Sequence, residues 1–339
     1  MTVQKLESLP PPPGVIGSLR AGFNAVSSHV GLILLPLVVD LFLWLGPRLS
    51  VGKVYSSLAV DWLALINASS LPVQDLRKIA ENTSGMVELL GRVNWLGWVR
   101  TIPIGIPSLM SGFIPEKLPT LTPLGLQDVI QTSSFLSMVG WIALLTLIGW
   151  VGGGLYFRWV SETTLGEQEA GISSARAIIQ TFILSVMWLV SLMVVSVPVV
   201  SVLGILILIN PALASGALLV ILILSFWLMV PLFFTPHGIF VRRQNALYSV
   251  VTSLRMARFT LPASSLFVFC VFILSTGLNY LWSVPPSDSW MTLVGIAGHA
   301  FITTALLAAS FVYYRDMNVW LQTVFEQLQQ KQSLPTRQA

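Results

Sequence analysis

Six apolar runs constrain this chain more than any other feature, because most of them are long enough to cross a bilayer. A spanning helix needs about 20 apolar residues to cover a hydrocarbon core about 30 Å thick. The chain holds only 9% charged residues among its 339, whereas soluble domains hold about 25%. We therefore predict an integral membrane protein with six crossings, at residues 29–46, 134–158, 177–209, 212–234, 262–282 and 290–314.

The distribution of basic residues over the short loops predicts the orientation of these crossings. The loop 235–261 contains four arginines, whereas the turns around Asn210 and Pro285 contain no lysine or arginine. Because basic residues of short loops stay on the cytoplasmic side, the loop is predicted to be cytoplasmic and the two turns extracytoplasmic. Six crossings then place both terminal segments, 1–28 and 315–339, in the cytoplasm.

An amphipathic stretch precedes each predicted pair of crossings. The clearest one lies in residues 235–261, where apolar residues recur at helical spacing between arginines. Related stretches lie in 1–28 and, with a more acidic polar face, in 159–176. Such a helix lies in the headgroup plane with its apolar face in the acyl boundary. The predicted fold is all-α, with three transmembrane hairpins that each follow a cytoplasmic amphipathic interfacial helix. Three unrelated interfacial helices are the alternative.

Four arginines of the loop 235–261 are the predicted contacts to lipid headgroups. Each basic residue near an anionic membrane surface contributes about 1 kcal/mol of attraction. The predicted partner is therefore a lipid bilayer with anionic headgroups. The arginines are Arg242, Arg243, Arg255 and Arg258.

The segment 47–133 is too rich in helical and apolar patterns to be a linker. Residues 55–68 and 73–92 are amphipathic, and the apolar stretch 95–125 that follows contains five prolines. Because proline lacks a backbone donor, this stretch cannot form a regular spanning helix. We predict an extracytoplasmic helical cap that packs on the outer membrane surface. A lid over a cavity is the alternative.

Two ionisable residues lie inside predicted crossings and are the candidate intramembrane polar pair. Asp40 lies about ten residues into the first crossing and His299 about eight residues into the last. At a rise of about 1.5 Å per residue, the two residues reach similar depths. Ionisable groups in the membrane are costly and usually face a partner or a cavity. Three interpretations stay open: a structural pair, a proton- or ion-handling site, and no contact.

Two glycines near the end of the second crossing, Gly149 and Gly153, have the spacing of a small-residue packing motif. Glycines four residues apart let a neighbouring element approach the helix closely. We predict that they serve helix packing. A functional hinge is the alternative.

Residues 231–258 and 308–317 resemble segments of bacterial six-helix integral membrane domains of largely unknown function. These domains include the membrane domain that accompanies some glycerophosphodiester phosphodiesterases. In them a crossing ends with a proline, which Pro236 matches, and a polar turn leads to an amphipathic helix. Val250, Ser253, Leu254 and Met256 match that helix.

The resemblance covers mainly residues 180–317, and the chain departs from it in the turn. Such families often carry an acidic residue and a glycine there, where this chain has Arg242, Arg243 and Asn245. The resemblance implies the six-helix fold and a location in the bacterial plasma (inner) membrane. It transfers no catalytic residue, because the chain has no phosphodiesterase domain.

Sequence motifs do not identify a chemical activity. The chain contains no P-loop, HExxH, GxSxG or dinucleotide-binding fingerprint. We therefore predict no catalytic residue, no cofactor and no metal site. The predicted function is the non-enzymatic organisation of lipid or of a partner, which could be another membrane protein or a second copy of the chain. Nucleic acid is not an expected partner.

Two other classes of function remain as alternatives. A small transporter or permease-like component needs a cavity between the hairpins, and a polar cavity that contains Asp40 and His299 would favour it. A membrane-embedded enzyme that acts on lipid is the weakest alternative, because it needs clustered carboxylates, histidines or metal ligands.

Overall fold

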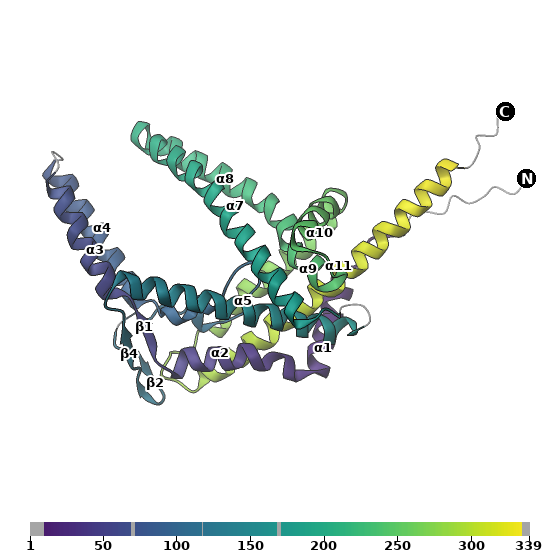
Figure 1. Cartoon of the computed structure of the whole chain (residues 1–339), viewed down its shortest axis with the longest axis horizontal. Coiled ribbons are helices and arrows are strands. Elements are labelled where there is room, and N and C mark those ends of the chain that lie inside the picture. Colours follow the sequence, from purple (N-terminus) through teal and green to yellow (C-terminus); the bar gives the residue numbers. More distant parts are fainter. Residues whose placement is uncertain (1–9, 69–71, 117, 168–170, 334–339) are drawn as a thin grey trace, which may run out of the picture. The chain divides into compact units, whose positions relative to one another are not determined.

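The computed structural model describes residues 10–68, 72–116, 118–167 and 171–333, and most of them are helical (Figure 1). The helices are α1 (Val15–Ser28), α2 (Leu34–Leu45), α3 (Gly52–Asn67), α4 (Val73–Arg92), α5 (Phe135–Leu165), α7 (Ser174–Ile209), α8 (Pro211–Phe233), α9 (Thr235–Arg242), α10 (Ala246–Trp282) and α11 (Met291–Ser333). Short 3₁₀ helices are η1 (Val30–Ile33), η2 (Trp95–Val99) and η3 (Met110–Gly112). The structure confirms the all-α class.

Two small β-ribbons accompany the helices. β1 (Arg48–Ser50) pairs in parallel with β4 (Val129–Gln131), and Arg48 lies opposite Val129. β2 (Leu121–Thr122) pairs antiparallel with β3 (Gly125–Leu126). The turn between β2 and β3 requires a positive φ of 115° at Gly125, which side chains other than glycine rarely adopt. These four strands lie in the segment 47–133, which was predicted as a helical cap, so the structure adds these ribbons to that prediction.

Several helices are suited to a membrane by length and composition. In the described part of the chain, α5, α7, α10 and α11 are each long and apolar enough to cross a membrane. Two further pairs, Val15–Ser28 with Val30–Leu45 and Pro211–Ser225 with Leu228–Arg242, qualify only together, because each pair bends by more than 40° at a short break. The described residues therefore contain four candidate spans, or up to six if each bent pair is one span.

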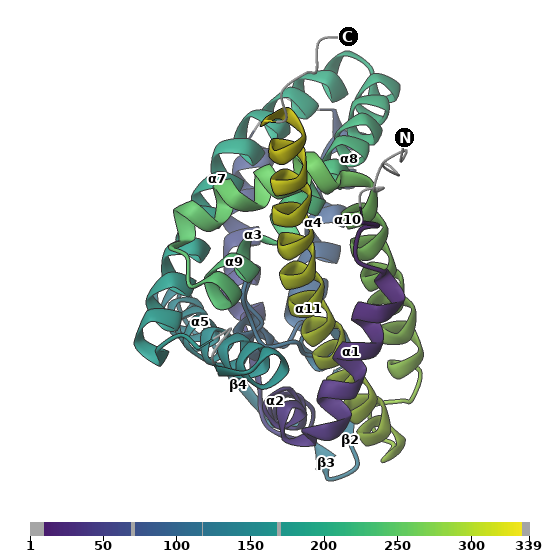
Figure 2. The same ribbon diagram turned by 90° about the vertical axis from the view of Figure 1, so that its right-hand side faces the viewer.

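The chain forms two compact units. Unit 1 consists of Met1–Val30, Phe157–Leu274 and Thr304–Ala339, and unit 2 consists of Gly31–Tyr156 and Ser275–Thr303. The helices α5, α10 and α11 contribute residues to both units. Within unit 1, α7 and α8 run side by side as a hairpin in both views (Figures 1 and 2). Within unit 2, α3 and α4 form a second hairpin.

The start of the long helix α10 differs from the predicted boundary at residue 261. α10 runs without a break through Pro262. The helical structure is instead interrupted at residues 243–245, between α9 and α10. Arg243 has a left-handed backbone there, with a φ of 54°. Proline is tolerated inside apolar helices where neighbouring groups satisfy the freed backbone. The single interfacial helix predicted over 235–261 is therefore divided between α9 and the first part of α10.

Two other helices extend past their predicted ends. α5 continues to Leu165, beyond the predicted end of the crossing at residue 158. α11 continues to Ser333, beyond the predicted end at residue 314, so most of the predicted cytoplasmic tail is helical. Both extensions carry polar and charged residues, which a helix accommodates once its backbone is already hydrogen bonded.

Small and polar side chains of α10 face the interior of unit 1. Ser249 donates a hydrogen bond to the carbonyl of Thr235, and Ser253 donates one to the carbonyl of Pro231. The apolar side chains of Leu247, Val251 and Leu254 are exposed instead. α1 shows the same pattern, with a buried face of Ser18, Gly22 and Val26. The parts of α1 and α10 that are buried in unit 1 thus include several small residues, whereas Leu247, Val251 and Leu254 point away from it.

Aromatic rings complete the core of unit 1. The rings of Phe267 and Tyr313 stack with their centroids 4.1 Å apart. His237 hydrogen bonds through Nε2 to the hydroxyl of Ser310 at 2.7 Å. Because His237 comes from the stretch 231–258 and Ser310 from 308–317, the two segments that carry the sequence resemblance pack against each other.

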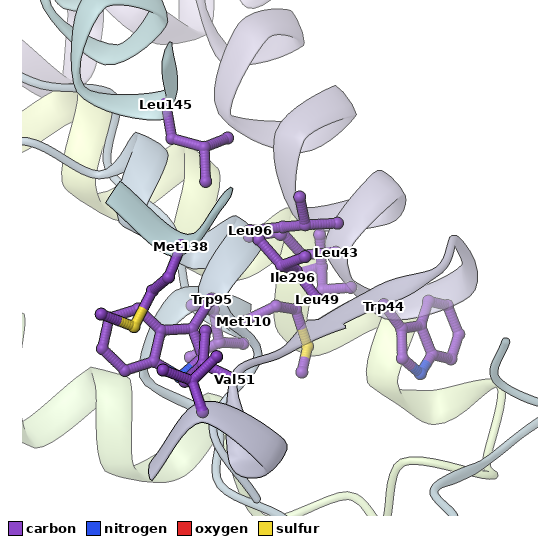
Figure 3. Packing of buried hydrophobic residues seen from close by; sticks show 12 residues of the cluster. Leu43, Trp44, Leu49, Val51, Trp95, Leu96, Met110, Met138, Leu145 and Ile296 are labelled. Atoms are coloured by element: carbon purple, nitrogen blue, oxygen red, sulfur yellow. The ribbon is translucent and has the colours of Figure 1, made fainter. Parts of the chain in front are cut away.

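The apolar core of unit 2 joins α2, η2, α5 and α11 (Figure 3). Trp95 stacks on Trp98 with ring centroids 5.7 Å apart and packs beside Tyr55 of α3. The core residues are Leu43, Trp44, Leu49, Val51, Val54, Trp95, Leu96, Leu109, Met110, Met138, Leu145 and Ile296. The proline-rich stretch 95–125 therefore supplies part of this core. The prediction described this stretch only as part of a cap on the outer membrane surface, whereas some of its residues are buried in the core of unit 2.

Candidate functional site

Gly149 and Gly153 of α5 pack closely against irregular backbone. A side-chain carbon at residue 153 would lie 2.7 Å from Cα of Gly105, closer than real contacts allow. Gly149 faces the backbone of Val99 and the side chain of Thr101 in the same way. The predicted close packing is present, but the partner is the non-helical segment 99–106 and not a second helix. This segment thus lies against the middle of a candidate span.

Asp40 hydrogen bonds to residues 108–110, which follow that segment. Its carboxylate accepts hydrogen bonds from the hydroxyl of Ser108 and from the backbone N–H groups of Leu109 and Met110, the last two at 2.9 Å each. Asp40 is fully buried. Hydrogen bonds from several donors let a carboxylate stay in an apolar interior. The partner of Asp40 is therefore the turn at residues 108–110.

His299 is also buried in unit 2, but no hydrogen bond or ion pair joins it to Asp40 in the described part of the chain. Its Nε2 atom has no hydrogen-bond partner among the described residues. The structural pair that the sequence left open is thus absent from the described contacts, because the turn at residues 108–110 occupies the carboxylate. A role of His299 in proton handling stays a prediction.

Arg100 interacts electrostatically with both of these residues and is the charged group of the candidate site. Its Nη1 atom donates a hydrogen bond to the carbonyl of Ser108 at 3.2 Å. No carboxylate lies within 4.0 Å of its guanidinium in the part of the chain that the structure describes. Arg100 is exposed on one side. The turn that Asp40 anchors thus also positions Arg100, because Ser108 contacts both.

A cavity of about 320 Å³ lies beside Arg100. Its walls are the segment 100–114, the end of α10, the turn 283–290 and the start of α11. Arg100 is the one charged residue among the described residues that line it. The other polar side chains in its wall are Asn279, Trp282, Ser283, Ser287 and Thr292.

The turn 283–290 is fixed from several sides. The indole N–H of Trp44 donates to the carbonyl of Ser287 at 2.7 Å, and Trp44 also packs edge-on against Trp290. The hydroxyl of Thr292 donates to the carbonyl of Pro286 at 2.8 Å. Gly298 of α11 leaves room for the ring of Trp282, which a side-chain carbon there would meet at 2.8 Å. This wall of the cavity is therefore preorganised.

Two polar atoms of the cavity wall lack partners. The indole N–H of Trp282 and the side-chain oxygen of Asn279 are buried and have no hydrogen-bond partner among the described residues. The hydroxyls of Ser283, Ser287 and Thr292 each donate to a backbone carbonyl. The charged donor that remains for a ligand is thus the guanidinium of Arg100.

A second cavity is much smaller and lies beside Arg48. It measures about 20 Å³, which is room for a single water molecule. The guanidinium of Arg48 is fully buried and donates to the hydroxyl of Thr120 and to the carbonyl of Arg92. Burial lowers the pKa of the Arg48 guanidinium from its usual value. Arg48 therefore ties β1 to its neighbours and leaves little space for a ligand.

The four predicted headgroup arginines occupy two kinds of environment. Arg242 donates to the side chain of Asn318 at 3.0 Å, and Arg243 donates to the carbonyl of Glu167 at 3.3 Å. Arg255 and Arg258 are exposed on α10. The first two thus also hold the α9–α10 connection in place, and all four are exposed, as a headgroup contact requires.

Sequence reasoning missed Arg100, Asn279 and Trp282 as one site, because about 180 residues separate the first from the other two. The available signal was a single arginine at residue 100 within the apolar stretch 95–125. Comparisons with family models, with curated proteins and with solved structures give no match to this chain. The resemblance of residues 180–317 to six-helix bacterial membrane domains therefore stays a prediction.

Proposed function

We propose that this chain is a multi-pass plasma-membrane protein that organises lipid or a membrane partner and carries out no reaction itself. The observation that supports this proposal is the exposed apolar surface of α10. Its buried face carries Ser249, Ser253, Thr260 and Ser264 beside Phe267 and Val268, whereas Leu254, Leu266 and Phe269 are exposed. In water such a surface would aggregate. In a bilayer the exposed face contacts lipid, and the small residues let helices approach each other closely.

The hairpin of α7 and α8 supports the same proposal. The most apolar window of α7 has a mean hydropathy of 2.9 and no buried residue. Helices that are apolar on every side belong in hydrocarbon or against another apolar helix. We propose anionic lipid as the main partner of this surface, and a second copy or another membrane protein as a further one.

The surroundings of Asp40 favour a structural role over a chemical one. The carboxylate already accepts three hydrogen bonds from residues 108–110, so its lone pairs are largely engaged within the fold. The cavity beside Arg100 contains neither Asp40 nor His299 in its wall. This arrangement supports binding at one side of unit 2 more than passage through the protein, which a transporter requires.

Spin labelling of the full chain in lipid vesicles tests the membrane embedding. After Cys270→Ser, single cysteines would be introduced at Leu218 of α8, at Leu254 of α10 and, as an aqueous reference, at Lys78 of α4. We expect the first two labels to collide mainly with oxygen and the reference label mainly with a water-soluble nickel chelate. A label at residue 254 that is as accessible to the chelate as the one at residue 78 would refute the embedding.

The organising role is tested by spin-labelled lipid in the same vesicles. We expect a motionally restricted lipid fraction that grows with the protein-to-lipid ratio and is larger for anionic than for neutral lipid. Vesicles loaded with ions or small solutes should show no protein-dependent flux. A flux with no restricted lipid fraction would support the transporter in place of this proposal.

A further inference from the structure

We propose that the cavity beside Arg100 binds the anionic headgroup of an amphiphile, a phosphate or carboxylate carried on an apolar chain. This inference rests on the proposed function, because it takes the protein to be in contact with lipid. On the predicted topology the turn 283–290 is extracytoplasmic, so the amphiphile would come from the outer leaflet.

The charge of the cavity selects the sign of the ligand. Arg100 carries a positive charge into the wall, and no carboxylate lies within 4.0 Å of it among the described residues. Arg100 interacts electrostatically with Asp40 and with His299. The carboxylate of Asp40 accepts its hydrogen bonds from residues 108–110 and forms no direct ion pair with the guanidinium of Arg100. An anion at the guanidinium would supply that pair.

The hydrogen-bond inventory also selects an acceptor-rich group. Arg100 spends one N–H on the carbonyl of Ser108, and a guanidinium has five. Because the three hydroxyls in the wall already donate to backbone carbonyls, the other N–H groups of Arg100 are the charged donors that a ligand meets in this cavity. Phosphate and carboxylate oxygens satisfy such donors, whereas a cationic or purely apolar ligand does not.

The size and the apolar wall argue for a headgroup with an attached chain. A volume of about 320 Å³ is at the lower end of ligand-binding cavities, so it fits a headgroup and not a whole lipid. Leu109, Met110, Phe113 and Ile114 form an apolar side of the wall. Ile114 is 45% exposed, so this side continues to the surface of unit 2. An acyl or isoprenoid chain could leave the cavity there without losing apolar contact.

Lipid retention by the purified full chain tests the site. The protein, prepared in a neutral detergent, would be mixed with phosphatidylglycerol or with phosphatidylcholine, and bound lipid would be counted by native mass spectrometry. We expect the wild type to retain the anionic lipid preferentially. Arg100→Gln should lower its retention by about tenfold, the effect of losing one charge-assisted interaction. Arg100→Lys should keep part of it, because it keeps the charge.

The matched control is Arg77→Gln on α4 of the same unit, since Arg77 is exposed and pairs only with Glu81 among the described acidic residues. This variant should retain the lipid like the wild type. Equal losses of lipid retention in Arg100→Gln and Arg77→Gln would overturn the proposal, and so would unchanged retention in Arg100→Gln. Arg100→Lys controls for a folding defect. If this variant keeps part of the lipid, substitution of residue 100 does not by itself unfold the protein, and the loss in Arg100→Gln is due to the missing charge.

Free headgroups distinguish lipid from a soluble phosphate. Inorganic phosphate and glycerol 3-phosphate, added at the lipid concentration, should not displace phosphatidylglycerol, because they lack the chain that contacts the apolar wall. Displacement at equal concentration would overturn the amphiphile as ligand. The proposed function fails separately: a protein that alkaline carbonate releases from membranes is not embedded. A protein that stays embedded and restricts lipid, but shows no anionic preference at Arg100, refutes this inference alone.

Discussion

The carboxylate of Asp40 shows at the scale of one residue how a charge in an apolar helix is accommodated. A bare carboxylate there would be costly, and the sequence left open a pair with His299 at a similar depth in the last crossing. The structure supplies a hydroxyl and two backbone N–H groups instead. Asp40 thereby orders the turn at residues 108–110. The carbonyl of Ser108 in this turn accepts a hydrogen bond from Arg100.

Asp40→Asn should destabilise the protein by about 1–3 kcal/mol, because a carboxamide cannot accept all three hydrogen bonds and leaves a buried N–H unpaired. Thermal unfolding of the full chain in detergent would measure the loss as a lower midpoint. Asp61→Asn on the exposed face of α3 is the matched control and should leave the midpoint unchanged.

A double variant with His299→Ala tests whether the two buried groups are coupled. Since no hydrogen bond or ion pair joins them in the described part of the chain, the two losses should add within about 0.5 kcal/mol. A double variant that is clearly more stable than the sum predicts would instead restore the structural pair.

At the scale of an element, the glycines of α5 show what a spacing motif leaves undetermined. Gly149 and Gly153 permit a close approach whatever the neighbour is, so the motif predicts tight packing but not its partner. The partner is the segment 99–106, in which Pro103 disfavours a regular helix. Non-helical backbone beside a candidate span is tolerated where protein buries it, and Ile104 and Ile106 are buried here.

Gly153→Leu should destabilise the protein by about 1–3 kcal/mol, the usual cost of overpacking a closely packed site. The contact to Gly105 leaves no room even for a first side-chain carbon. Gly140→Leu, on an exposed part of the same helix with no atom within 4 Å of the added carbon, is the control and should be neutral or stabilising. Chemical denaturation in a fixed detergent compares the two, and equal effects would contradict the packing.

At the scale of the whole molecule, the number of crossings decides which segments share a side of the membrane. With six crossings, residues 90 and 210 are both extracytoplasmic. With four, in which the two bent helix pairs return to the side they left, residues 90 and 210 are both cytoplasmic. Residue 247 is cytoplasmic and residue 286 extracytoplasmic in either case, so these two positions calibrate the assay.

Reporter fusions at the four positions test this topology. Six crossings agree best with the arginine-free turn at Asn210, so we expect phosphatase activity at residues 90, 210 and 286 and none at residue 247. Inactive fusions at both 90 and 210 would reduce the number of crossings to four. An active fusion at 247 would contradict the orientation as a whole.

The sequence by itself determined the helices and their suitability for a membrane. An apolar run in lipid has to satisfy its backbone internally, so its length and composition suffice to predict a helix. The start of α10 was beyond this reasoning, because the sequence predicted a crossing that begins at Pro262, whereas α10 begins at Ala246 and runs through that proline. Apolar periodicity also could not tell that Ser249 faces inward and Leu247 outward. In lipid the more apolar face need not be the buried one.

Only the tertiary structure decided the partner of Asp40, the packing of residues 95–125 and the cavity beside Arg100. Each depends on residues that are distant in sequence: Asp40 meets residues 108–110, and Arg100 meets Asn279 and Trp282 across one cavity. Such hydrogen bonds and cavities form where segments that are distant in the sequence come into contact. The pattern of residues along the chain does not show which segments will be in contact. The membrane helices follow from local chemistry, whereas the candidate site exists only because non-helical backbone is packed among them.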